Sequence, residues 1–132
     1  MDLIAEKLAQ ASEFVRAAGV DAWLTLVRET SAGGDPVLPF LIEGGLVWDS
    51  ALLVFPDGRS VAVVGRYDAD PLRKAGHWSE VVAYDQSLWP ELKRVLGDAG
   101  RVAINFSEND VMADGLAHGM YLRLVAHDVF RA

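Results

Sequence analysis

Hydrophobic and charged positions near the N-terminus repeat with the period of a helix. Apolar residues recur every three or four positions across residues 2–18, and mostly charged or amide side chains lie between them. This pattern predicts an amphipathic helix over 2–18, and Gly19 is expected to end it. Residues 22–27 read AWLTLV, an apolar run of strand length with β-branched and aromatic members. The order predicts a helix that covers a strand.

The middle of the chain has the pattern of a β-hairpin. Two apolar runs, 50–55 and 60–64, flank residues 56–59, which read PDGR and contain the proline, aspartate and glycine that favour turns. Strands that are joined by so short a turn pair in the antiparallel direction. We therefore expect the sheet to contain at least one antiparallel pair.

Helical and strand patterns alternate after the hairpin. The spacing predicts a short helix over 67–74, a strand over 80–84, a helix over 88–96 and a strand over 101–106. A final helix is predicted beyond the last strand. This order is typical of an α/β fold. We predict one domain over residues 1–132, built in three layers, with a mixed sheet flanked by helices.

Residues 28–47 separate the first strand from the hairpin. They contain charged side chains, two prolines and the stretch SAGGDP. This composition predicts a loop, interrupted by a short apolar turn around 37–42. A loop of this length in a compact domain is usually functional or mobile, so it is a place to look for binding residues.

The segment 107–124, which reads SENDVMADGLAHGMYLRL, is predicted to form the final helix. Ser107 and Asp110 have the three-residue spacing of a helix N-terminal cap. Gly115 and Gly119 are expected to allow close packing on the sheet. An apolar line at four-residue spacing is formed by Met112, Leu116, Met120 and Leu124.

Asp114 and His118 are also four positions apart, a spacing that places two side chains on one side of a helix. They could share a metal ion, form an acid-oriented imidazole, or form a solvated ion pair. A zinc or manganese site needs about three protein ligands, and neither His77 nor His127 has a spacing that supplies the third. We favour the ion pair and predict no metal ligands in this chain.

Composition narrows the classes of function. The chain has 132 residues, 52% of them hydrophobic, and its formal net charge of −7 disfavours nucleic acid or an anionic membrane surface as a partner. It has no cysteine, which excludes disulfides, thiolate nucleophiles and cysteine zinc sites. No signal-peptide pattern opens the sequence and no apolar run reaches about 18 residues, so a cytoplasmic location is expected.

Common catalytic motifs do not occur in the sequence. No serine lies in a G-x-S-x-G elbow, and H-E-x-x-H is absent. The glycine pairs at 33–34 and 44–45 match neither a phosphate-binding loop nor a dinucleotide fingerprint. We therefore predict no catalytic residue in this chain.

Two long segments together resemble the N-terminal domain of the creatinase/prolidase/Xaa-Pro aminopeptidase family. They read AWLTLVRETSAGGDPVLPFLIEGGLVWDSALLVFPDGRSVAVVGRYDAD, residues 22–70, and RVAINFSENDVMADGLAHGMYLRL, residues 101–124. Their most specific parts are the hairpin, the GRYDAD turn at 65–70 and the SENDVMADGLAHGMY segment at 107–121. The resemblance covers almost the whole chain.

The resemblance implies that a larger "pita-bread" catalytic domain follows this one in a full-length enzyme. In that family the catalytic domain holds two divalent metal ions, of manganese or cobalt type, with two Asp, one His and two Glu. None of that domain is expected within residues 1–132, so this chain alone is predicted to be inactive. The ending VAHDVFRA departs from the family pattern, which suggests a shortened chain or a divergent stand-alone relative.

The parent protein implied by the resemblance is a hydrolase, an aminopeptidase or dipeptidase that acts on proline-containing peptides as a cytoplasmic homodimer. The resemblance implies a non-catalytic role for the N-terminal domain itself. It would contact a neighbouring subunit and the C-terminal catalytic domain, and it would form part of the wall of the substrate entrance.

The candidate residues for that entrance are Arg28, Glu29 and Trp48, in and beside the long loop. The two charges suit a peptide terminus, and the indole offers an aromatic face. An Arg–Glu pair after a strand is nevertheless more often solvated surface, and a tryptophan before a strand is more often packed. Core or core-edge positions are expected for Trp23, Trp78 and Trp89.

The sequence leaves two other functions open. One is a stand-alone module that binds a small molecule or peptide without a catalytic partner, because a fold does not determine a function. The other is a small hydrolase that uses Asp114 and His118, which requires both side chains to face a cleft shared with other polar groups.

Overall fold

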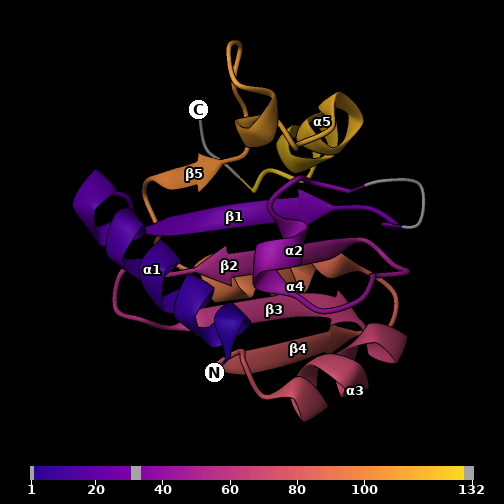
Figure 1. The fold of residues 1–132 in the computed structure, drawn as a ribbon. Coiled ribbons are helices and arrows are strands. Elements are labelled where there is room, and N and C mark those ends of the chain that lie inside the picture. Colours follow the sequence, from indigo (N-terminus) through magenta and orange to yellow (C-terminus); the bar gives the residue numbers. More distant parts are fainter. Residues whose placement is uncertain (1, 31–33, 130–132) are drawn as a thin grey trace.

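The chain folds into a mixed five-stranded sheet between two layers of helices (Figure 1). The computed structural model describes residues 2–30 and 34–129. The helices are α1 (Leu3–Ala18), α2 (Leu38–Leu41), α3 (Arg66–Ala75), α4 (Leu88–Leu96) and α5 (His118–Ala126), with a 3-10 helix η1 (Val111–Ala113). The strands are β1 (Ala22–Val27), β2 (Ser50–Val54), β3 (Ser60–Gly65), β4 (Glu80–Tyr84) and β5 (Val102–Ile104). The predicted α/β domain with a mixed sheet is confirmed.

Helix α1 ends at the predicted residue, Ala18, and begins one residue later than predicted, at Leu3. The Asp2 carboxylate accepts a hydrogen bond from the Ala5 N–H at 3.2 Å, which satisfies one of the free donors at the helix start. Gly19 ends the helix with a φ of +70°, a left-handed conformation that glycine adopts without a steric penalty.

Only part of the apolar face of α1 is buried. Ile4, Leu8 and Val15 lie in the core, whereas the side chain of Phe14 is 74% exposed. A helix that packs on a sheet buries a stripe of its surface, and Phe14 lies at the flank of that stripe.

The strand order in the sheet is β4-β3-β2-β1-β5. The pairs β1–β2 and β2–β3 are antiparallel, whereas β1–β5 and β3–β4 are parallel. The predicted hairpin is β2–β3, and its turn is closed by a 2.9 Å hydrogen bond from Phe55 N–H to the Arg59 carbonyl oxygen. Gly58 within this turn has a φ of +95°, which explains why glycine occupies the position.

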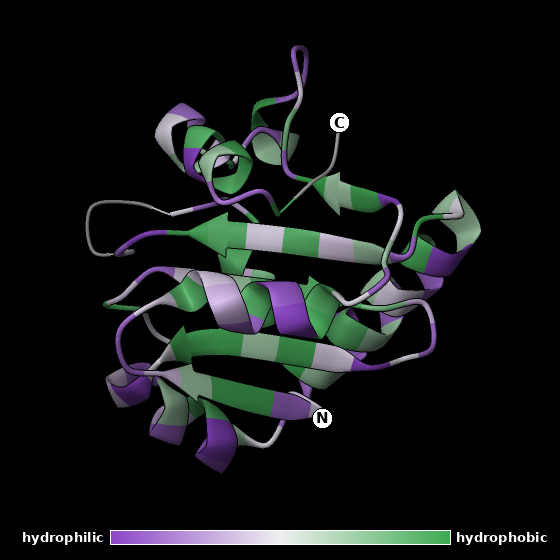
Figure 2. Cartoon of the chain, turned by 180° about the vertical axis from the view of Figure 1, so that it is seen from behind, coloured by the Kyte–Doolittle hydropathy of each residue, from purple (hydrophilic) through white to green (hydrophobic). Residues whose placement is uncertain are grey.

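The sheet separates two hydrophobic cores. Consecutive side chains of a strand point to opposite faces, so Leu52 contributes to the core under α1, α2 and α3, and Leu53 to the core under α4 and α5. Figure 2 shows the strands coloured as mainly hydrophobic, while hydrophilic residues gather on the outer helices. Both faces of β2 and β3 are buried, which accounts for their nearly continuous apolar sequence.

The loop predicted over 28–47 contains the short helix α2, at the place where a short apolar turn was expected. Residues 31–33 of its SAGGDP stretch lie outside the described part of the chain. The loop is not wholly exposed, because Asp35 within it is only 4% exposed.

The prediction of one helix that begins at residue 107 is wrong. Residues 107–117 contain only the 3-10 turn η1, and the regular helix α5 begins at His118. Ser107 and Asp110 do accept hydrogen bonds from backbone N–H groups, but they close local turns, with the Ser107 hydroxyl bonded to Asn109 and Asp110 N–H. Such local bonds compete with helix formation.

The apolar line proposed for that helix is correspondingly broken. Met120 and Leu124 are buried in the core, whereas the side chain of Met112 is 60% exposed. The backbone N–H of Leu116 donates to the Asn105 carbonyl oxygen at 2.9 Å, which folds this segment back on the end of β5. Within the described residues, no helix is both long enough and apolar enough to cross a bilayer.

Candidate functional site

Strand pairing brings the three predicted entrance residues together. Arg28 and Glu29 follow β1, and Trp48 precedes β2. Because these strands are antiparallel with Val27 opposite Ser50, the end of β1 lies beside the start of β2. Arg28, Glu29 and Trp48 line one shallow hollow of about 500 Å³, which we call the entrance hollow. Its other lining residues are Val47, Asp49, Tyr84, Asp85 and Gln86.

Trp48 is half-buried and packs within an aromatic cluster. Its ring lies edge-on to Tyr67 at a centroid distance of 5.7 Å and is tilted against Tyr84 at 5.8 Å. The indole also lies close to Gly65, where an added Cβ atom would collide with the ring. Trp48 is therefore packed, as is usual for a tryptophan before a strand, and it still lines the entrance hollow.

A buried carboxylate holds the backbone that carries Trp48. Asp68, in α3, is 8% exposed and accepts hydrogen bonds from the Val47 N–H at 3.0 and 3.2 Å and from the Trp48 N–H at 3.2 Å. These charge-assisted bonds fix the chain just before β2. Asp68 belongs to the GRYDAD turn, but its sequence position alone did not reveal this role.

Asp49 and Tyr84 form a second polar contact in the entrance hollow. The Tyr84 hydroxyl donates to the Asp49 carbonyl oxygen at 2.5 Å, and Arg123 Nη1 donates to Asp49 Oδ2 at 2.6 Å. Burial, together with the nearby negative charges of Asp49 and Asp68, raises the pKa of Tyr84 to about 12. The phenol therefore stays protonated at neutral pH and acts as a hydrogen-bond donor.

Arg28 contacts the beginning of α5. Its guanidinium lies over Gly119, where an added Cβ atom would come within 2.7 Å of Nη2. Gly119 is thus closely approached by the Arg28 side chain, which follows β1, and not by the sheet on which it was expected to pack. The charges of Arg28, Glu29, Asp49 and Asp85 around the entrance hollow suit hydrogen bonds to a polar group such as a peptide terminus.

Asp114 and His118 line a different pocket. Its volume is about 540 Å³, and Phe106, Leu116 and Tyr121 also line it. Both Asp114 and His118 are exposed, and they do not lie on one helix: Asp114 follows η1, and His118 begins α5. The two side chains share a cleft, but the hydrolase hypothesis also requires other polar groups there, and among the described lining residues only Tyr121 supplies one.

The other two histidines lie away from that pocket. His77 Nδ1 is 2.6 Å from Asp2 Oδ2, and the His127 ring stacks on Trp89 at 4.5 Å. Across residues 2–30 and 34–129, no group of three or more His, Asp or Glu side chains is arranged to hold a metal ion.

Comparison with solved structures shows the same fold in N-terminal domains of proline dipeptidases. The N-terminal domain of an Xaa-Pro dipeptidase from Lactobacillus brevis is 18% identical, with a TM-score of 0.62, and the match covers 96% of this chain and 89% of that chain. The creatinase/prolidase N-terminal domain of an X-Pro dipeptidase from Streptococcus pyogenes is 18% identical with a TM-score of 0.60, and 96% of each chain is covered.

A longer solved structure, that of a prolidase, shares this fold over part of its length. The prolidase from Pyrococcus horikoshii OT3 is 14% identical with a TM-score of 0.66, and the match covers 95% of this chain and 30% of that chain. This chain therefore spans less than a third of that prolidase. Neither a protein-family model nor a curated protein matches the sequence.

Proposed function

We propose that this chain is the non-catalytic N-terminal domain of a metal-dependent Xaa-Pro peptidase, an aminopeptidase or dipeptidase. The observation that carries the proposal is the match of nearly the whole chain to nearly the whole of two N-terminal domains of dipeptidases. A C-terminal catalytic domain would then hold the two divalent metal ions and act on proline-containing peptides. The parent enzyme would be a cytoplasmic homodimer.

Within that enzyme, the entrance hollow would form part of the wall of the substrate entrance. Arg28 and Glu29 follow β1 and Trp48 precedes β2, and these two parts of the chain meet at one end of the sheet. Asp68 holds the backbone of Trp48, so the position of the indole is fixed before a peptide binds. A fixed aromatic wall beside charged side chains would restrict the size of peptides that pass.

The gene that encodes the chain provides the first test. The proposal requires the reading frame to continue past the codon for Ala132 into a domain with two Asp, one His and two Glu ligands. A stop codon at that point would contradict it and favour the stand-alone binding module. The isolated chain should show no hydrolysis of Xaa-Pro dipeptides with manganese or cobalt, and metal-stimulated turnover by the purified polypeptide would refute the non-catalytic role.

The entrance role has its own test in the encoded enzyme. Trp48→Ala and Arg28→Ala should increase the hydrolysis of longer proline peptides relative to dipeptides, because each removes part of the wall. Arg73→Ala, on the exposed side of α3, is the matched control and should leave this ratio unchanged. An unchanged ratio in all three variants would remove the entrance role while leaving the domain assignment intact.

A further inference from the structure

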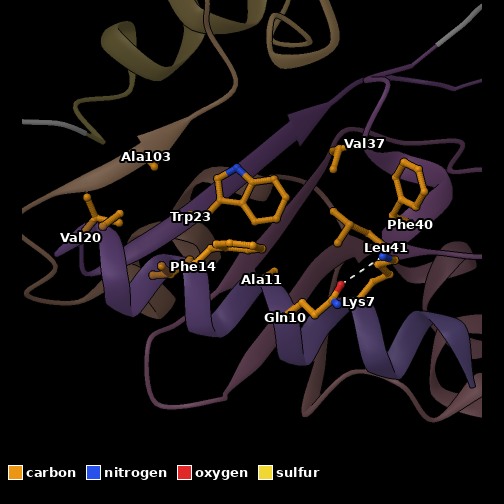
Figure 3. Close-up of a pocket in the computed structure, with 12 residues that line it drawn as sticks. Lys7, Gln10, Ala11, Phe14, Val20, Trp23, Val37, Phe40, Leu41 and Ala103 are labelled. Carbon is orange, nitrogen blue, oxygen red and sulfur yellow. Dashed lines mark hydrogen bonds between the residues drawn. The ribbon is translucent and has the colours of Figure 1, made fainter.

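An apolar groove lies on the α1 side of the sheet, well apart from the entrance hollow. It has a volume of about 480 Å³ and runs between α1, α2 and the β1–β5 edge of the sheet (Figure 3). Aromatic side chains from three elements line it: Phe14 from α1, Trp23 from β1 and Phe40 from α2. Volumes between about 300 and 1,000 Å³ are usual for small-molecule sites.

The floor of the groove is rigidly supported. Trp23 Nε1 donates to Asn105 Oδ1 at 2.6 Å, and Asn105 Nδ2 donates to Thr25 Oγ1 at 3.0 Å and to Asp35 Oδ2 at 2.7 Å. Asn105, Thr25 and Asp35 are all buried. This hydrogen-bond network lies outside the groove and holds the indole ring in one orientation. Because the ring is already fixed, less conformational entropy is lost when a ligand binds against it.

Two of the aromatic side chains are more exposed than packing would require. Phe14 is 74% exposed and Phe40 is 45% exposed. Figure 3 shows Phe14 next to the Trp23 indole and Phe40 farther along the groove, beyond Val37 and Leu41. Contiguous apolar surface of this kind on a folded domain commonly marks a binding site.

The charge of the groove is positive. Among the described residues that line it, Lys7 alone is charged, although the whole chain has 19 acidic and 12 basic residues. Lys7 is half-buried, and its Nζ lies 3.1 Å from Gln10 Oε1 at the α2 end of the groove (Figure 3). Val20 and Ala103 line the opposite end, so the groove has one polar end and a long apolar remainder.

We propose that this groove binds a small amphipathic carboxylate. The apolar body of the ligand lies against Trp23 between Phe14 and Phe40, and its carboxylate accepts hydrogen bonds from Lys7 Nζ and the Gln10 side-chain amide. The single cation selects an anionic head group, because a ligand ammonium at the same end would meet Lys7 without any compensating acid among the lining residues. Every residue named in the site belongs to this chain.

Calorimetric titration of the 132-residue chain tests the proposal, with dodecanoate and dodecylammonium used below their micelle concentrations. Dodecanoate should bind saturably, and dodecylammonium should bind more weakly. Phe14→Ala should weaken dodecanoate binding about tenfold, because an aromatic contact is lost. Lys7→Gln should weaken it about threefold and remove the preference for the carboxylate. Bound dodecanoate should also shift the NMR signal of the Trp23 indole N–H.

The matched controls lie outside the groove. Leu122→Ala, at an exposed position of α5, and Lys93→Gln, on the exposed side of α4, should leave dodecanoate binding unchanged. Phe14 is too exposed for its truncation to prevent folding, and Phe40→Ala provides a second variant of the same wall.

Four results would overturn the proposal. The first is no saturable binding, and the second is equal binding of the two head groups by the unmodified chain. The third is dimerisation of the chain in sedimentation experiments that is lost in Phe14→Ala and insensitive to dodecanoate, which would make the groove an interface between copies. Binding that persists unchanged in both Phe14→Ala and Phe40→Ala would likewise exclude this site.

Discussion

Tyr84 lies where the sheet, α5 and the loop before β2 meet. Its hydroxyl donates to the Asp49 carbonyl oxygen, and the Asp49 carboxylate is bonded to Arg123. Asp49 and Arg123 are 74 positions apart, so no local pattern in the sequence indicates that they meet. The same is true of Asp68, whose bonds reach residues 20 and 21 positions earlier.

The raised pKa of Tyr84 predicts a specific loss of stability at alkaline pH. The folded value of about 12 lies above the ordinary value of 10.0. The stabilising contribution of the protonated phenol is therefore complete below pH 10.0 and is lost as the pH rises through about 12. Near neutral pH, Tyr84→Phe should be about 1 kcal/mol less stable than the unmodified chain, because it loses one hydrogen bond.

This difference should shrink as the pH approaches the folded pKa of Tyr84. Urea unfolding midpoints of both proteins across that range measure it. Tyr67→Phe is the matched control, since Tyr67 is 68% exposed, and it should follow the unmodified chain throughout. A gap between Tyr84→Phe and the unmodified chain that stays constant with pH would contradict the assigned ionisation.

At the scale of elements, the segment 107–117 shows how a tertiary contact can override a helical pattern. Its spacing of apolar residues favours a helix, but the chain is drawn back across the end of β5 by the bond between Leu116 and Asn105. Gly115 in this segment lies directly on the carboxylate of Asp35, which is 4% exposed. The segment and the loop before α2 are therefore packed on each other through a position that has no room for a side chain.

Gly115→Ala should destabilise the domain by about 1–3 kcal/mol, because the added Cβ atom would overlap the Asp35 carboxylate and displace a buried network. Thermal or urea unfolding measures the effect. Gly100→Ala is the matched control: its Cβ atom would lie 3.5 Å from the nearest atom, Asp21 Oδ2, in ordinary contact. Equal stabilities of the two variants would show that Gly115 is not closely packed.

At the scale of the whole molecule, the two cores share one sheet. Leu52 is 1% exposed and faces the core under α1, while its neighbour Leu53 is 0% exposed and faces the core under α4. Because both cores use the same strands, neither can be lost while the sheet stays fully packed. We therefore expect the domain to unfold in one cooperative transition.

Truncation of either leucine tests this coupling. Leu52→Ala and Leu53→Ala should each lower the free energy of unfolding by about 2–5 kcal/mol. Each should shift a single urea transition that is the same by far-ultraviolet circular dichroism and by tryptophan fluorescence. Leu122→Ala, at a 51% exposed position, should change stability little. Two separated transitions in either core variant would show that the layers unfold independently.

Local chemistry in the sequence was sufficient to predict most of the elements. The bounds of α1 follow from its periodicity and from Gly19, and the β2–β3 hairpin follows from its PDGR turn. These features depend on residues a few positions apart, whose interactions are already determined by short-range geometry. The mixed sheet follows from the same hairpin, since one short turn requires an antiparallel pair.

The sequence by itself thus determined the α/β class and the main helices and strands. It also indicated which charged and aromatic residues were candidates for a substrate entrance. Only the tertiary structure decided that Arg28, Glu29 and Trp48 line one hollow, that Asp68 holds Trp48, and that residues 107–117 are not helical. It also decided that Phe14 remains exposed beside Trp23. The physical reason is that these outcomes depend on strand order and on contacts between distant residues, whereas helix ends and turns depend on neighbours in the chain.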